Sequence, residues 1–89
     1  MRIFKYEIHN LEQQYVDLPA GAKFLTLQLQ GDKCVFWAEI NPKTTRLERH
    51  QLVTYMTGQD IPQNPGGYLG TYQLRGIVCH VYISHIGEI

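Results

Sequence analysis

Apolar and polar side chains alternate residue by residue along most of this 89-residue chain. Residues 24–30 show the pattern clearly, because polar residues separate Leu25, Leu27 and Leu29. Successive side chains of a β-strand point to opposite faces of a sheet, so the alternation predicts a half-buried strand with these leucines on its inner face. A chain dominated by this two-residue period is expected to fold mainly into β-strands.

Six strands are expected from this pattern and from the turn residues between them, at residues 3–8, 14–18, 24–30, 34–40, 68–74 and 77–83. A turn at residues 31–33 predicts that the third and fourth of these strands form a β-hairpin. The pair Arg75-Gly76 predicts a second hairpin between the last two strands.

Residues 44–57 allow two interpretations. Thr45 and Glu48 have the spacing of a capping box, which would begin a short helix. Val53 and the two residues after it instead favour a long, edge-like strand. The expected fold class is therefore all-β, or β with one short helix. We expect an antiparallel meander of six to seven short strands, in a curled sheet or small open barrel, within a single domain of residues 1–89.

The charge balance and the apolar runs exclude several classes of partner. Eight Lys and Arg offset eight Asp and Glu, whereas a DNA or RNA binder needs clustered positive charge. No apolar run is long enough for a membrane span, and Lys5 and Glu7 interrupt the apolar stretch that a signal peptide requires. We expect a soluble cytoplasmic protein, in which Cys34 and Cys79 are free, buried thiols.

Charge and tyrosine are distributed unevenly along the chain. Residues 1–50 carry seven Lys or Arg and six Asp or Glu, whereas residues 51–89 carry only Asp60, Arg75 and Glu88. The second part also contains the tyrosines Tyr55, Tyr68, Tyr72 and Tyr82. Aromatic enrichment with charge depletion is typical of interface cores, and zero net charge favours association, so a homo-oligomer is expected. The alternative is that these strands are central in the sheet and covered on both faces.

No group of residues has the spacing that catalysis or metal binding commonly shows. The acidic residues are scattered among other charged residues, which is typical of a solvated face rather than of an acid–base pair. Cys79 and His80 point to opposite faces of one strand, and so do His80 and His85. We therefore expect no catalytic residue, no metal site, no cofactor and no enzymatic activity.

One set of residues could bind a small anionic ligand. Arg46, Arg49 and His50 fall within five positions, and arginine can hold phosphate through two parallel N–H groups. Tyrosine rings could stack on a nucleotide base or pack against a protein. The alternative is a solvated charge cluster at a strand edge that prevents sheets from aggregating. The candidate ligand-binding residues are Arg46, Arg49, His50, Tyr55, Tyr68, Tyr72 and His80.

The order and spacing of several sequence blocks resemble a family of small phage and prophage proteins described as a domain of unknown function. The blocks lie at residues 4–8, 17–23, 27–30, 37–38, 57–62, 68–74 and 80–82. Members usually carry Gly-Gly where this chain has Arg75-Gly76, and the tail after Ile83 is particular to this chain. The resemblance implies a compact, mostly antiparallel β protein made inside a bacterial host. It carries over no catalytic residue, and its shared Gly70 suggests a close approach of two backbones.

Two functions from different classes are expected. The first is a phage accessory protein that sequesters a host-defence nucleotide signal in pockets of an oligomer, which partly rests on analogy with other small phage proteins. The second is a protein-interaction module that binds a host or phage protein through a tyrosine-rich, charge-poor surface or a sheet edge.

Overall fold

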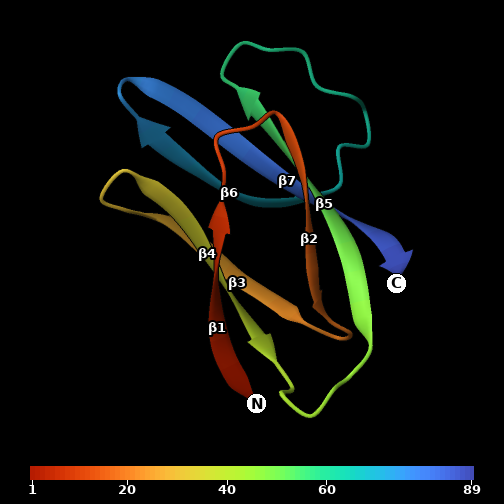
Figure 1. Ribbon diagram of the computed structural model, residues 1–89. Helices are drawn as coiled ribbons and strands as arrows, with labels where there is room; N and C mark the ends of the chain where they lie inside the picture. Colours follow the sequence, from red (N-terminus) through yellow and green to blue (C-terminus); the bar gives the residue numbers. More distant parts are fainter.

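The computed structural model describes residues 1–89 and consists of seven antiparallel β-strands without a helix (Figure 1). The strands are β1 (Arg2–Ile8), β2 (Gln13–Pro19), β3 (Lys23–Gln30), β4 (Lys33–Ile40), β5 (Leu47–Met56), β6 (Gly67–Leu74) and β7 (Ile77–Glu88). The all-β, antiparallel prediction is confirmed, and so are both predicted hairpins, β3–β4 and β6–β7. No helix is present that is long and apolar enough to cross a membrane.

The strands form two sheets that pack against each other. One sheet has three strands in the order β1-β4-β3, and the other has four in the order β2-β5-β7-β6. Neither sheet closes into a barrel, and the strand order departs from a simple meander because β1 pairs with β4 and β2 with β5. Strands distant in the sequence therefore lie side by side, which the local pattern could not indicate.

The ambiguous segment of residues 44–57 forms the strand β5 rather than a helix. Its β-branched and aromatic residues Val53, Thr54 and Tyr55 favour the extended backbone over the helix that Thr45 and Glu48 could have begun. The predicted position at a sheet edge is wrong, because β5 lies between β2 and β7.

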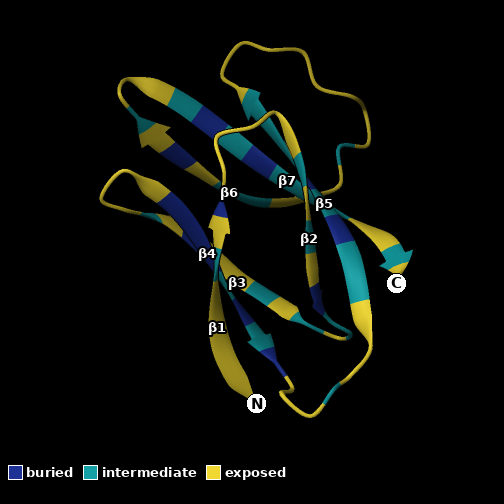
Figure 2. Cartoon of the chain, viewed as in Figure 1, coloured by how far each residue is buried: buried dark blue, intermediate teal, exposed yellow.

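The core lies between the two sheets and consists of the inward-facing residues of every strand (Figure 2). Phe36, Leu18, Leu52 and Val81 are its largest fully buried side chains. Thirteen of 89 residues are buried, so most of the outer faces of both sheets stay accessible to water. A core of this size is what a chain of about 90 residues can build.

A β-bulge in β3 changes which residues of this strand face the core. The register with β4 shifts between Phe24 and Thr26, so that Phe24, Leu27 and Leu29 pack toward the core. Leu25 remains 39% exposed, which corrects the prediction that it shares the inner face with the next two leucines. An extra residue in one strand turns the side chains of the residues that precede it to the opposite face of the sheet.

The two sheets approach most closely where β6 crosses β3, at Gly70. A Cβ atom on this glycine would lie 2.5 Å from Cγ of Leu27, a buried residue of the opposing sheet. Gly70 therefore lies at a close approach between the sheets, but the backbone of β6 meets the side chain of Leu27 there rather than the second backbone that was expected.

We predict that Gly70→Ala destabilises the protein by about 1–3 kcal/mol, because the added methyl group overpacks the core against Leu27. Gly67→Ala is the matched control, since its Cβ would lie 3.6 Å from the nearest atom, an ordinary contact. Urea denaturation of the three proteins measures the difference. Equal free energies of unfolding for the two variants would contradict this account of the sheet packing.

Both thiols are predicted to resist alkylation in the folded protein. Cys34 and Cys79 are buried and unpaired, and burial together with the nearby Cys79 thiol raises the pKa of Cys34 to about 11. Little of Cys34 is thiolate at pH 8, and the thiolate is the form that reacts, whereas burial alone shields Cys79 from the reagent. Intact-mass analysis after iodoacetamide treatment should show no adduct without denaturant and two adducts in guanidinium. Rapid modification of the native chain would contradict the burial of Cys34 and Cys79 in the core.

Candidate functional site

The outer face of the four-stranded sheet is the surface on which tyrosines gather. Alternation on the paired strands places side chains from β2, β5, β7 and β6 on the side away from the core. We call this surface the tyrosine face. Its residues are Gln13, Tyr15, Asp17, Arg49, Gln51, Val53, Tyr55, Tyr68, Thr71, Gln73, Val78, His80, Tyr82 and Ser84.

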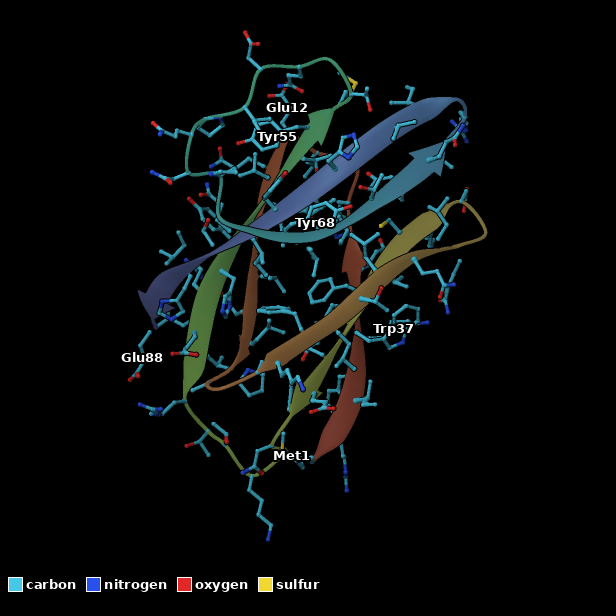
Figure 3. All side chains as sticks on the ribbon, turned by 180° about the vertical axis from the view of Figure 1, so that it is seen from behind. Met1, Glu12, Trp37, Tyr55, Tyr68 and Glu88 are labelled. Atoms are coloured by element: carbon cyan, nitrogen blue, oxygen red, sulfur yellow. The ribbon has the colours of Figure 1, made fainter.

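Three of these tyrosines form a cluster around Tyr82 of β7. The ring of Tyr82 meets that of Tyr55 edge-on at 5.9 Å and that of Tyr68 at 5.5 Å. This T-shaped geometry is favourable for aromatic pairs and gives the cluster a defined shape. In Figure 3, Tyr55 lies beside the loop that joins β5 to β6, and Tyr68 lies on β6.

That loop borders a shallow pocket of about 280 Å³ next to the cluster. The pocket is lined by Tyr55, Tyr82 and His80 from the sheet and by loop residues that include Ile61. No lysine or arginine lines it. Its aromatic and apolar walls suit a side chain of similar character better than they suit a phosphate group.

His80 is held in place by the hydroxyl groups on either side of its ring. Its Nε2 atom is 2.7 Å from Oγ1 of Thr57, and its Nδ1 atom is 2.9 Å from Oγ1 of Thr71. Thr71 in turn shares a hydrogen bond with the hydroxyl of Tyr68. Because both ring nitrogens are engaged, His80 orders this end of the tyrosine face rather than standing free as a base.

The arginines at the other end of the four-stranded sheet are already paired with carboxylates of the same chain. Arg49 donates two hydrogen bonds to Asp17, at 2.9 and 3.1 Å, and its guanidinium lies over the ring of Tyr15 at 5.6 Å. The hydrogen bond from Arg49 holds the pKa of Asp17 below its usual value. Arg46 likewise donates to Glu88 at 3.0 Å.

The seven predicted site residues therefore do not form one pocket within the chain. Tyr55, Tyr68 and His80 come together in the cluster. Arg49 lies on the same face of β5 as Tyr55 but six residues away, a separation of about 20 Å along an extended strand. The labelled Glu88, which binds Arg46, marks this distant end of β7 in Figure 3.

Two of the predicted residues face the core. Tyr72 is 7% exposed, and burial, with a smaller effect of Cys79, raises its pKa to about 12. His50 is also 7% exposed and lies against the ring of Phe24. Neither ring lies on the tyrosine face, so neither can stack there on a ligand.

The structure also brings together residues that no local sequence pattern indicated. Tyr15 joins the tyrosine face because β2 pairs with β5, where its partner Gln51 lies 36 residues further along the chain. Glu48 and His85 lie beside His50, with one possible ligand atom from each of the three within 4.8 Å of the others. In the sequence, only the two-residue spacing of Glu48 and His50 points to this cluster, because it places both side chains on one face of a strand.

Residues 1–87 match the family described as a domain of unknown function, DUF7352. The chain belongs to this family, since the match covers nearly all of its 89 residues. No curated protein matches the chain. No solved structure matches it either.

We predict that Thr57→Val loosens the loop of residues 57–66, because it removes the hydrogen bond between Thr57 and His80. One such bond at an exposed site contributes about 1 kcal/mol or less. Amide exchange measured by mass spectrometry should become faster in peptides from this loop and stay unchanged in β3 and β4. Thr45→Val, at an exposed position outside this network, is the control and should leave exchange in the loop unaltered. Equal protection of the loop in both variants would contradict the role given to His80.

Proposed function

We propose that this protein is a non-enzymatic protein-interaction module that binds a second copy of itself through the tyrosine face. The observation that supports this most directly is that four tyrosines gather on the outer face of a sheet that no other strand covers. Tyr15 and Tyr68 are 57% and 61% exposed. Tyrosine is enriched at protein interfaces and contributes strongly to their binding energy.

The outer face of the other sheet has a different character, which supports the choice of surface. The register of β1, β4 and β3 brings four charged residues, Lys5, Glu7, Lys23 and Glu39, to the outside there, together with Ile3 and Trp37. These charged side chains favour contact with water. The tyrosine face has a single ion pair, Arg49 with Asp17, whose charges already offset each other.

A second copy fits this surface in charge and in size. The chain has zero formal net charge, so two copies do not repel each other. Tyrosine hydroxyls both donate and accept hydrogen bonds, as a self-complementary two-fold interface requires. Four strands of about nine residues give roughly 600 Å² of projected area, so two copies would bury about 1,200 Å², at the lower end for a specific interface.

Nucleotide sequestration, the other expected function, receives less support from the geometry. It requires a free cation beside a stacking ring. Within the chain, Arg46 and Arg49 are bonded to carboxylates, and Arg49 is about 20 Å from Tyr55 along β5. The aromatic cluster also lacks a lysine or arginine in its pocket.

We predict that the wild-type protein associates in solution and that Tyr68→Lys prevents this, because the introduced charge would have to be desolvated within the interface. Sedimentation velocity over a hundredfold range of concentration measures the mass. The wild type should approach twice the chain mass of 10.3 kDa, and Tyr68→Lys should remain near one chain mass.

Gln28→Lys is the matched control for this experiment. It introduces the same side chain at an exposed position on the outer face of the other sheet, and it should associate like the wild type. Far-UV circular dichroism verifies that both variants fold. A wild type that keeps a single chain mass at every concentration would overturn the proposal, and so would a Tyr68→Lys variant that associates normally.

A further inference from the structure

Three side chains that can bind metal meet at the end of the β5–β7 ladder, far from the tyrosine cluster. Glu48 and His50 are two residues apart on β5 and share one face of the strand. His85 on β7 is the cross-strand partner of His50. One potential ligand atom from each of the three lies within 4.8 Å of the other two. Two imidazoles and one carboxylate form a ligand set that binds Zn²⁺ in proteins.

Part of the cluster already has the spacing of metal ligands. Nε2 of His85 is 3.2 Å from Oε2 of Glu48. Two ligands of a tetrahedral Zn²⁺, each bonded at about 2.0–2.1 Å, lie about 3.3 Å apart. The nitrogen of His50 has to move by about 1.5 Å at most to reach the same spacing.

His50 has a buried polar atom for which the protein provides no partner. The residue is 7% exposed, and its Nδ1 atom makes no hydrogen bond. Its ring lies edge-on to that of Phe24 at 5.2 Å and to that of His85 at 5.3 Å. Leaving a buried polar group without a partner is unfavourable, and a bound metal ion would give this imidazole the strong polar interaction that it lacks.

Glu48 is oriented toward the cluster by the backbone. The N–H of Gly21 donates to Oε1 of Glu48 at 3.2 Å, which leaves Oε2 facing His85. A partner that fixes one oxygen of a carboxylate and leaves the other free is typical of the surroundings of metal ligands.

An ion pair alone accounts for only part of this arrangement. The side chain of His85 is 54% exposed, and an exposed ion pair with Glu48 would stabilise the fold little. Such a pair also leaves the buried His50 unexplained. Arg46, two residues before Glu48, does not oppose a cation strongly, because it is already paired with Glu88.

We propose that Glu48, His50 and His85 form a site for one Zn²⁺ ion, with a fourth coordination position open to water. The site would connect β5 to the C-terminal part of β7. Its ligands come from the inner side of the sheet, so it is separate from the tyrosine face and independent of the proposed self-association.

Isothermal titration calorimetry tests the site on the full chain after removal of metal with a chelator. Zinc chloride should bind in a ratio of about one ion per chain. His85→Ala and Glu48→Gln should each weaken binding at least about tenfold, because each removes one ligand. Both side chains are partly exposed, so both variants are expected to fold, which circular dichroism verifies.

His9→Ala is the control, because His9 is an exposed histidine outside both the proposed metal site and the tyrosine face, and the zinc affinity of this variant should equal that of the wild type. Titration with cobalt chloride should give the intense visible bands of a tetrahedral site without thiolate charge-transfer absorption, which distinguishes it from binding to Cys34 or Cys79. The absence of saturable zinc binding by the wild type would overturn the proposal. Unchanged affinity in His85→Ala and Glu48→Gln, or a thiolate band, would overturn it as well.

Discussion

The ladder between β5 and β7 is the interaction on which the rest of this structure depends. Both strands are long, of 10 and 12 residues, and they lie at the centre of the four-stranded sheet. Because side chains alternate along each strand, the ladder supplies Leu52 and Val81 to the core and Tyr55 and Tyr82 to the outer face. The core, the proposed interaction surface and the proposed metal site therefore share one set of backbone hydrogen bonds.

The packing of the two sheets explains why a small chain retains so much accessible aromatic surface. Three strands cover one side of the four-stranded sheet, and the contact depends on the absence of a side chain at Gly70 opposite Leu27. All seven strands of residues 1–89 lie in these two layers. The opposite side of the larger sheet consequently stays open, and its tyrosines gain burial only when another protein surface covers them.

Much of the fold follows from local pattern, and much of the site does not. Alternation and turn residues predicted the strands and both hairpins, because these features depend on neighbours in the sequence. The bulges at Phe24/Thr26 and Tyr68/Gly70 could not be predicted from the alternation of residues. The second bulge explains why Tyr68 lies on the outer face while Tyr72, four residues later, faces the core. The pairing of His50 with His85 depends on the strand order, which no local pattern specifies.

Native-state amide hydrogen exchange tests most directly whether the β5–β7 ladder is the central element. If it is, the hydrogen-bonded amides of β5 and β7 should exchange most slowly and only through global unfolding, at the free energy that urea denaturation gives. Amides of β1 and of the β3–β4 hairpin should exchange through smaller openings. Slower exchange in the β3–β4 hairpin than in β5 and β7 would contradict the account.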